Sequence, residues 1–414
     1  MSAGRYKIRG LPVRVELLQL LDRWVFSFFC LVLTFFTLPR RLFPLKRKNP
    51  KKILLVKLAE QGSSVLAIPA IQSAIQMVGK NNVYAIVFEE NRFILDVIGL
   101  IPPENIFPVR QESLFAMIGS TFGNLITIRA KHIDAAVDLE FFARFSAAIT
   151  FLSGAKMRSG LHAYFGEGPY RGDLMTHRVL YNPHIHTSQM FEVLVLALQQ
   201  DPSRFPTLPH CPPRFMRPHV FQASLSDQAH LKKKLFSKYP INEKTRIILV
   251  NPNASDLLPL RRWDTDRYVQ LIRKILSRYP SAWVCITGTE GEKTKAERIR
   301  EEVNSEYCIN IAGRTTLDEL MVLYCVADIL ITNDSGPAHF ASLTNIQMVV
   351  LFGPETPHLF EANSDKSQSV YIGLPCSPCI NALNNRQTAC LDNQCMKQIT
   401  PDMVFDRVTK VLAT

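Results

Sequence analysis

Residues 327–339 read A-D-I-L-I-T-N-D-S-G-P-A-H, and this stretch decides how the chain is interpreted. Its first part, residues 328–332, is a short apolar run rich in β-branched side chains, which is typical of a buried strand. Residues 333–337 then break the strand, and a helix is expected over 338–343 with Ser335 as its N-cap. A sharp turn from strand to helix presents free backbone N–H groups, which suit a phosphate or diphosphate. An ordinary strand–turn–helix connection explains the spacing equally well.

The rest of the chain after residue 50 repeats this alternation of strand and helix. Apolar runs predict strands at 53–58, 83–88, 133–139, 247–250 and 283–287, and helical spacing predicts helices at 65–78, 265–278 and 293–304. The rhythm favours parallel sheets covered on both faces. A length of 414 residues is natural for two domains, and six prolines between residues 202 and 218 mark a connection between them.

Three ordered motifs resemble the signature of glycosyltransferase family 9, the ADP-heptose:lipopolysaccharide heptosyltransferases. They are T-N-D-S-G-P-A-H followed by V-V-L-F-G-P-E, the pattern K-I-L-L-V-K-L-A-E-Q-G-S-S-V-L-A-I-P at 52–69, and the cysteine pattern at 376–396. The resemblance covers residues 51–412 and implies a GT-B fold, an α/β architecture of two Rossmann-like domains facing across a cleft. The expected parts are a membrane-associating segment at 1–50, an acceptor domain at 51–215, a donor domain at 216–400, and a terminal helix at 401–414 that returns toward the first domain.

The resemblance implies a nucleotide-sugar donor site at the carboxyl ends of the strands of the second domain. Arg262 matches a basic position of the family and would neutralise the departing diphosphate, although Arg261 and Arg262 could equally be a solvated surface pair. Glu292 matches the acid that the family uses on the nucleotide ribose, and a helix N-terminal acid is a compatible reading. The expected donor-binding residues are Asn253, Arg262, Gly288, Glu292, Asn333, Asp334, Ser335, Gly336, Pro337 and His339.

The first loop departs from the family at its expected general base. Family members have Gly-Asp there, whereas this chain has Gly62-Ser63. A serine hydroxyl is no base at neutral pH unless another group activates it, and Glu60 on the same loop could supply a carboxylate. Glu60 could also be an ordinary exposed loop acid. Asp138 and Glu140, at the end of a predicted strand, are the second candidates. The expected catalytic residues are Glu60, Ser63 and Asp138.

Residues 24–38 form an uncharged apolar segment of fifteen residues near the start of the chain. A helix of that length extends about 22 Å, short of the roughly 30 Å hydrocarbon core of a bilayer. Seven Lys and Arg residues follow between positions 40 and 52. The pattern favours a helix that lies in one leaflet of an anionic membrane, at the cytoplasmic face of a bacterial inner membrane, rather than a nucleic-acid-binding segment. A single N-terminal anchor that spans the membrane and a buried helix of the globular fold are the alternatives.

Four cysteines cluster as C-x2-C-x10-C-x4-C at Cys376, Cys379, Cys390 and Cys395. A structural zinc ion, disulfides and free thiols are all compatible with this spacing. No D-x-D motif stands at a donor-side strand end, so the expected enzyme needs no catalytic metal or other cofactor.

The sequence therefore predicts an inverting glycosyltransferase that uses a nucleotide-diphosphate sugar, ADP-heptose-like by resemblance. The expected acceptor is lipopolysaccharide or another lipid-linked glycan. The loss of the Gly-Asp motivates an alternative, a catalytically silent GT-B protein that binds a glycolipid or nucleotide sugar. A Rossmann oxidoreductase is disfavoured because no G-x-G-x-x-G follows a predicted strand.

Overall fold

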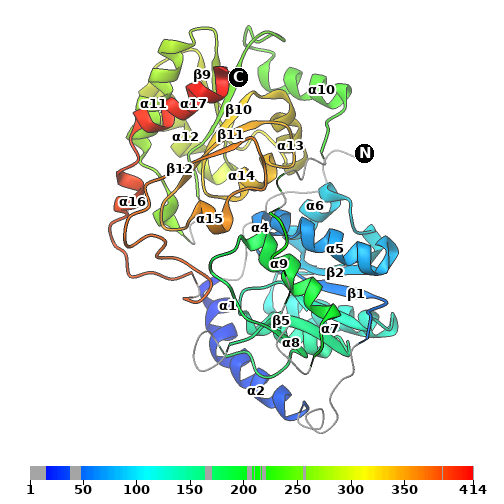
Figure 1. Ribbon diagram of the computed structural model, residues 1–414. Coiled ribbons are helices and arrows are strands. Elements are labelled where there is room, and N and C mark those ends of the chain that lie inside the picture. Colours follow the sequence, from blue (N-terminus) through cyan, green and yellow to red (C-terminus); the bar gives the residue numbers. More distant parts are fainter. Residues whose placement is uncertain are drawn as a thin grey trace. The chain divides into compact units, whose positions relative to one another are not determined.

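The structure is a computed structural model, and it describes residues 15–37, 48–163, 170–202, 208, 210–214, 216, 221–254, 258–384 and 386–413. The chain forms two compact units, each built around its own six-stranded sheet (Figure 1). The N-terminal unit contains Arg9–Phe215 and Ala382–Arg386, and the C-terminal unit contains Met216–Asn381 and Gln387–Thr414. The chain passes from one unit to the other within the proline-rich stretch.

The sheet of the N-terminal unit is entirely parallel. Its strands are β1 (Ile53–Val56), β2 (Val83–Phe88), β3 (Ile106–Val109), β4 (Ala135–Asp138), β5 (Met157–Leu161) and β6 (His177–Val179), in the order β3-β2-β1-β4-β5-β6. Ile53 at the start of β1 pairs with Val83 on one side and Ala135 on the other. Helices cover both faces, which is why the strands read as continuous apolar runs.

Two helices share one face of this sheet. The helices of the unit that follow the N-terminal segment are α4 (Gln61–Leu66), α5 (Ile68–Val78), α6 (Glu89–Ile98), α7 (Leu114–Ala130), α8 (Arg144–Leu152) and α9 (Thr187–Leu196), with 3₁₀ turns at Lys80–Asn82, Pro103–Asn105 and Ala197–Gln199. Leu125 of α7 and Ile149 of α8 belong to one buried apolar cluster with Leu54 and Ile86 of the sheet. By contrast, α5 packs against α9.

The C-terminal unit repeats the same arrangement. Its parallel strands are β7 (Ile247–Asn251), β8 (Trp283–Ile286), β9 (Cys308–Asn310), β10 (Ile329–Asn333), β11 (Gln347–Phe352) and β12 (Ser367–Tyr371), in the order β12-β11-β10-β7-β8-β9. In both sheets the first and fourth strands along the chain are neighbours. The order of strands reverses there, and α/β sheets bind ligands beyond the carboxyl ends of the strands at such a switch point.

The terminal helix belongs to the C-terminal unit. The helices of this unit are α10 (Leu225–Phe236), α11 (Thr265–Arg278), α12 (Lys293–Val303), α13 (Leu317–Val326), α14 (Gly336–Ala341), α15 (Pro357–Phe360), α16 (Gln394–Lys397) and α17 (Pro401–Ala413), with 3₁₀ turns at Pro259–Arg261 and Glu290–Glu292. Helix α17 packs against α11, β11 and β12. The reason is its buried stripe of Val404, Val408 and Val411, which inserts into the core of this unit. The expected return of α17 toward the first domain stays a prediction.

The N-terminal apolar segment packs on the N-terminal unit as α1 (Val15–Leu21), a π-helical turn at Asp22–Phe26, and α2 (Ser27–Phe35), drawn in dark blue in Figure 1. Cys30 and Leu33 are buried against Ala147 and Ala148 of α8. The carboxylate of Asp22 accepts hydrogen bonds from the first two N–H groups of α8, each at 2.9 Å. Within the described ranges, no helix is both long and apolar enough to cross a bilayer. The segment therefore adds an outer layer to this unit.

Candidate functional site

Asn333 ties together two loops at the switch point of the C-terminal unit. Its side chain is fully buried, and its Oδ1 accepts hydrogen bonds from the N–H of Trp263 at 3.3 Å and the hydroxyl of Tyr268 at 3.0 Å. Its Nδ2 donates to the carbonyl of Asn253, at 3.2 Å, in the loop after β7. Asn333, an expected donor-binding residue, therefore holds the neighbouring loop in position.

Three of the expected donor-binding residues meet at the carboxyl end of β8. A Cβ atom on Gly288 would lie 2.9 Å from Nδ2 of Asn253 and 3.1 Å from Oε2 of Glu292. Oε2 of Glu292 accepts two hydrogen bonds from Thr289, one from the backbone N–H at 2.7 Å and one from the side-chain hydroxyl at 2.9 Å. Thr289 and Glu292 form a capping box at the start of this helical turn. Glu292 is thus a helix-capping acid next to Asn253, and Gly288 is the residue that lets the two loops come so close.

The two adjacent arginines have different partners. Arg262, the expected diphosphate cation, donates from Nε and Nη2 to the carbonyl of Ala254 at 3.1 and 2.8 Å. Nη1 of Arg261 donates to the carbonyl of Asp334 at 3.1 Å and to the carboxylate of Glu355 at 3.1 Å. It also lies 3.6 Å from the carboxylate of Asp334. The cation joined to the turn after β10 is therefore Arg261, whose guanidinium lies close to the carboxylates of both Asp334 and Glu355.

Glu355 is the residue of this arrangement that the sequence analysis did not single out. It follows β11 in the G-P-E that was read only as part of the family signature, and its exposure is 1%. A buried carboxylate needs a partner, and Arg261 supplies it. The signal in the sequence was an acid just beyond the end of an apolar strand.

The turn after β10 has the predicted form. Ser335 precedes α14, which begins at Gly336 with Pro337 in its first turn. The hydroxyl of Ser335 donates to the carbonyl of Asn333 at 3.1 Å and makes no capping bond to the helix. His339 is buried, with 7% exposure. The predicted strand, turn and helix are all present, and α14 is a short helix of six residues.

A buried ion pair fixes the switch point of the N-terminal unit. Nζ of Lys57, just after β1, lies 2.9 Å from Oε1 of Glu140, just after β4. The same oxygen accepts the N–H of Ala59 at 2.9 Å. Both side chains are nearly inaccessible to solvent, so the loop from β1 to α4 is anchored directly beneath Glu60.

Glu60 is the expected catalytic residue whose carboxylate reaches solvent. Its side chain is 41% exposed and forms an ion pair with Arg386 of the same unit. Its backbone has a φ of 65°, which is unusual for a residue with a side chain and marks a strained turn. Ser63 is buried, and its hydroxyl donates to the backbone carbonyl of Glu60 at 3.0 Å. The hydroxyl of Ser63 is therefore bonded to main chain rather than to a base.

Asp138, the third expected catalytic residue, is completely enclosed. Its carboxylate pairs with the guanidinium of Arg171 and accepts hydrogen bonds from the hydroxyl of Ser146 and the N–H of Glu140, both at 3.0 Å. Burial raises the pKa of Asp138 to about 6, against the opposing effect of Arg171. With no exposed surface, this carboxylate has no open side for an acceptor hydroxyl and instead holds the ends of β4 and α8 together.

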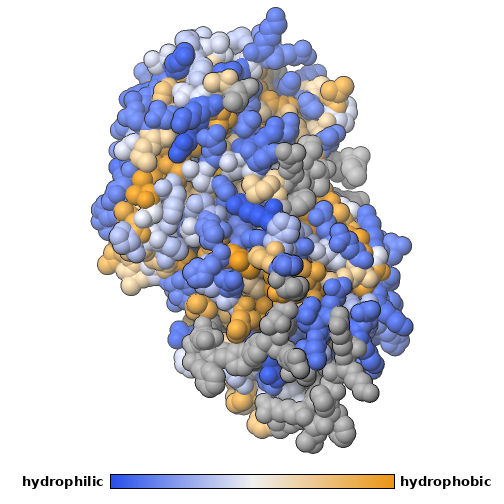
Figure 2. Space-filling model, viewed as in Figure 1, coloured by the Kyte–Doolittle hydropathy of each residue, from blue (hydrophilic) through white to orange (hydrophobic). Residues whose placement is uncertain are grey.

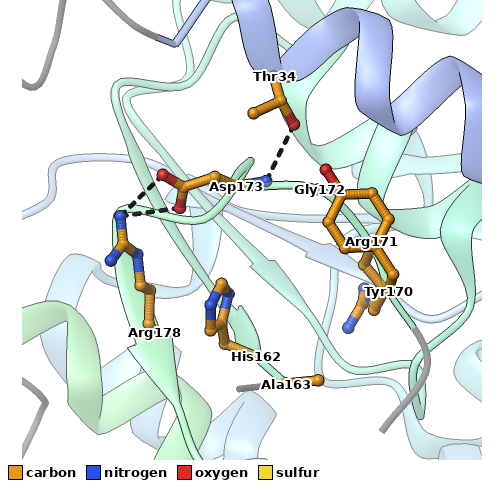
Figure 3. A pocket seen from close by; sticks show the side chains of 8 residues that line it. All are labelled: Thr34, His162, Ala163, Tyr170, Arg171, Gly172, Asp173 and Arg178. Atoms are coloured by element: carbon orange, nitrogen blue, oxygen red, sulfur yellow. Dashed lines mark hydrogen bonds and ion pairs between the residues drawn. The ribbon is translucent and has the colours of Figure 1, made fainter. Parts of the chain in front are cut away.

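A cavity of about 320 Å³ lies at the carboxyl end of β5 in the N-terminal unit (Figure 3). Its lining residues are Thr34, His162, Ala163, Tyr170, Arg171, Gly172, Asp173 and Arg178. Asp173 pairs with Arg178 at 2.8 Å, and its N–H donates to the hydroxyl of Thr34 at 3.0 Å. Burial, aided by Arg178, lowers the pKa of His162 to about 4, so this imidazole is neutral at pH 7. Because both arginines are paired with carboxylates, the cavity is polar rather than strongly cationic.

Comparison with known proteins shows the family. The sequence model of glycosyltransferase family 9 (heptosyltransferase) matches residues 127–389, more than half of the chain. The chain belongs to glycosyltransferase family 9. The matched residues run from α7 to the cysteine-containing loop and include every loop of the donor-side switch point.

Relatives of this family 9 chain include two bacterial heptosyltransferases. It is 28% identical over 191 residues to lipooligosaccharide heptosyltransferase 2 of Haemophilus influenzae, which covers 45% of this chain and 54% of that protein. It is 24% identical over 252 residues to lipopolysaccharide heptosyltransferase 2 of Escherichia coli. The matched region covers 59% of this chain and 67% of that protein. The match thus spans about half the length of the first relative.

A solved structure supports the fold. The Escherichia coli ADP-heptose LPS heptosyltransferase II superposes with a TM-score of 0.65 at 19% identity, over 87% of this chain and 98% of that one. At this identity the likeness concerns the fold. Two parallel α/β units are what the predicted GT-B architecture requires.

The four clustered cysteines of this family 9 chain are free thiols in the structure. Cys376 is exposed, whereas Cys395 is buried, and burial raises the pKa of Cys395 to about 11. In the part of the chain that the structure describes, no group of three or more His, Cys, Asp or Glu residues is placed to hold a metal ion. Zinc binding by these four thiols stays a prediction, as do the disulfide and free-thiol alternatives.

Proposed function

We propose that the chain is an inverting glycosyltransferase that moves a sugar from a nucleotide-diphosphate donor to lipopolysaccharide or another lipid-linked glycan. The observation that carries the proposal is the contact between loops at the donor-side switch point. There Asn253, Gly288 and Glu292 lie together, and Arg261 is joined to the turn after β10. The printed names of the relatives, which are heptosyltransferases, favour an ADP-heptose-like donor.

In the proposed reaction, the acceptor hydroxyl attacks the anomeric carbon from the side opposite the nucleotide. A base takes the hydroxyl proton, the new carbon–oxygen bond forms, and the bond to the diphosphate breaks with its electron pair leaving on the nucleotide. The C-terminal unit binds the donor, and the guanidinium of Arg262 opposes the negative charge that develops on the leaving diphosphate. No step of this scheme needs a metal ion.

We assign the base to Glu60. Its carboxylate is accessible, whereas Asp138 is enclosed and the hydroxyl of Ser63 bonds to main chain. Arg386 would have to release or share this carboxylate when the acceptor binds. The loop that carries Glu60 is anchored next to it, because Glu140 pairs with Lys57 and accepts the N–H of Ala59.

The test is a transfer assay with ADP-heptose and other nucleotide sugars, comparing the wild type with Glu60→Gln. The amide is nearly isosteric but cannot take a proton, so we expect kcat to fall at least about a hundredfold while the KM for the donor changes little. Glu112→Gln, at an exposed acid of the same unit, is the matched control and should retain full activity. Full activity of Glu60→Gln would remove Glu60 as the base.

The second candidate function is a catalytically silent protein that binds a nucleotide sugar or glycolipid. Ser63 in place of the expected Asp and the enclosure of Asp138 favour it. Isothermal calorimetry separates the two functions. Donor binding by the wild type without transfer to any acceptor, and without donor hydrolysis, would support the silent protein.

We also propose that the protein associates with the cytoplasmic face of a bacterial inner membrane through its N-terminal segment. Exposed apolar side chains on the π-helical turn and α2 support this, with Trp24, Phe28, Phe35 and Phe36 each more than 60% exposed. The basic residues between 40 and 52 follow directly in the sequence, and cations close to an apolar helix strengthen binding to anionic lipid. A lipid-linked acceptor would be reached there without leaving the bilayer.

A further inference from the structure

The outer face of α7 is apolar along nearly its whole length. Phe115, Ile118, Phe122 and Ile126 follow one another at helical spacing and are 88%, 54%, 66% and 57% exposed. No charged residue occurs from position 114 to position 128. A helix that packs one face on a sheet normally carries charged and polar side chains on the other, so this face is unusual for a surface in water.

The inner face of α7 provides the side chains with which this helix packs on the core of the unit. Met117, Leu125 and Ile128 are buried in the apolar cluster beneath the helix, and Thr121 between them is buried too. The outer stripe adds nothing to that cluster. Its four large side chains therefore need another explanation than packing within the unit.

This outer stripe lies on the same side of the sheet as the N-terminal segment. α7 and α8 share one apolar cluster on that side, and the π-helical turn and α2 pack on α8. The segment exposes its own apolar side chains there, and Figure 2 shows orange atoms around the end of the N-terminal unit where Figure 1 places α2. Two elements far apart in sequence thus leave apolar side chains on one side of one unit.

Basic side chains stand where α7 ends. Lys48, Lys51, Arg129 and Lys156 are exposed at the amino-terminal edge of the sheet, and Lys131 is partly exposed among them. Asp134, an acid of this edge, accepts hydrogen bonds from the backbone N–H groups of residues 51 and 52. An apolar stripe beside exposed cations is complementary to a surface with an apolar interior and anionic headgroups.

We propose that the outer face of α7 is a second membrane-binding element, which docks the N-terminal unit on an anionic lipid bilayer together with α2. The proposal rests on the membrane association suggested above and extends it to a helix 80 residues further along the chain. Phe115, Phe122 and Ile126 enter the headgroup boundary, while the basic edge contacts lipid phosphates. Two elements on one side of the unit fix its orientation on the membrane, which a single segment does not.

The experiment measures binding of the full chain to vesicles of phosphatidylethanolamine and phosphatidylglycerol by co-sedimentation. Phe122→Ser and Ile126→Ser change exposed side chains, so both variants should fold, which circular dichroism checks. Each should weaken vesicle binding about tenfold, because each removes one large apolar side chain from the bilayer. Leu225→Ser, at an 84% exposed apolar residue of α10 in the other unit, is the matched control and should bind as the wild type does.

A transfer assay separates this inference from the proposed function. With a water-soluble acceptor fragment the α7 variants should react like the wild type, and with the acceptor in vesicles they should be slower. Absence of transfer to either acceptor by the wild type would contradict the proposed function and leave the binding result standing. Vesicle binding of Phe122→Ser and Ile126→Ser equal to that of the wild type would overturn the inference. A wild-type dimer that these variants convert to monomers, with vesicle binding unchanged, would overturn it in favour of a second copy.

Discussion

Gly288 carries no side chain at the one position where Asn253 and Glu292 come together. Gly288→Ala would place a methyl group 2.9 Å from Nδ2 of Asn253 and 3.1 Å from Oε2 of Glu292, so that at least one of these side chains must shift. We expect the Kd for the nucleotide sugar to rise about tenfold, with a stability loss of about 1–3 kcal/mol. Donor titration calorimetry and thermal unfolding measure the two effects.

Gly291→Ala is the control for this change. A Cβ at Gly291 would have its nearest neighbour 3.9 Å away, at the hydroxyl of Thr289, which is an ordinary contact. Donor affinity equal to that of the wild type in both variants would mean that this contact between loops has no part in binding the donor.

Arg261 is the second residue on which the donor side depends. Arg261→Met would remove the ion pair that Arg261 makes with Glu355, whose side chain is 1% exposed, and we expect a loss of about 3 kcal/mol in the free energy of unfolding. Adding Glu355→Gln removes the buried charge and should restore part of that stability. Urea unfolding of the single and double variants measures the coupling. Independent, additive losses would contradict the ion pair seen in the structure.

For single residues, the sequence predicted which loops carry the charged side chains, but it did not predict which partner each side chain contacts. The basic pair Arg261-Arg262 and the acid Glu292 were correctly placed near strand ends, yet Arg262 binds a carbonyl and Arg261 meets the carboxylates. Arg261 ends a 3₁₀ turn and Arg262 is extended, so the two side chains have different partners, and the partners of Arg261 follow β10 and β11, which no local pattern contains. Glu355 was missed for the same reason.

Among the elements, α17 provides a clear test of packing. Val408 is fully buried between α11 and the sheet, so Val408→Ala should cost about 2 kcal/mol in the stability of the C-terminal unit. Arg407→Ala, at the exposed neighbouring position, should change stability by less than about 0.5 kcal/mol. Chemical unfolding followed by tryptophan fluorescence measures both variants. Equal effects would mean that α17 does not dock as described.

Elements with strong periodicity were predicted almost residue for residue. The strand over 83–88 and the helix over 265–278 have the predicted bounds, because continuous burial and a clear apolar stripe mark both ends. The N-terminal segment was harder to predict. Its apolar run suggested one helix over 24–38, but the structure has a π-helical turn at Asp22–Phe26 and ends α2 at Phe35. Asp22 reaches α8 from that turn, a long-range contact that composition does not reveal.

At the scale of the whole molecule, two separate cores predict that acid weakens the two units unequally. His177 lies in the N-terminal unit with 2% exposure, and burial lowers its pKa from 6.5 to about 4. The unfolded chain therefore binds a proton that the folded unit rejects. This contribution to stability is present above pH 6.5 and is lost as the pH falls toward 4, by about 1 kcal/mol per pH unit.

Hydrogen exchange measured by mass spectrometry across this pH range resolves the two units. Protection of the N-terminal unit should fall on acidification, and His177→Gln should make the fall shallower because glutamine does not titrate. The burial-raised pKa of Asp138 acts in the opposite direction in both proteins and cancels in the comparison. An equal fall in both proteins would mean that His177 is not buried in its neutral form.

The sequence predicted an architecture of two α/β units, but it did not predict the order of the strands and therefore did not predict the switch points. Alternating strands and helices predicted parallel sheets, whereas the order of strands depends on which way each crossover turns. Once β1 lies beside β4, and β7 beside β10, the loops that carry Glu60 and Asn253 are fixed at the ligand-binding edges.

The layer formed by the N-terminal segment has a practical consequence for anyone preparing this protein. A membrane anchor that makes no contact with the folded domain can be deleted to obtain a soluble protein that does not aggregate. Here Cys30 and Leu33 cover Ala147 and Ala148, and Asp22 caps α8. Deletion of residues 1–37 would expose the side of α8 that faces away from the sheet, and we expect the shortened protein to aggregate. Hydrophilic substitutions on the outward side chains of α2, with the helix retained, are the better route to a detergent-free preparation.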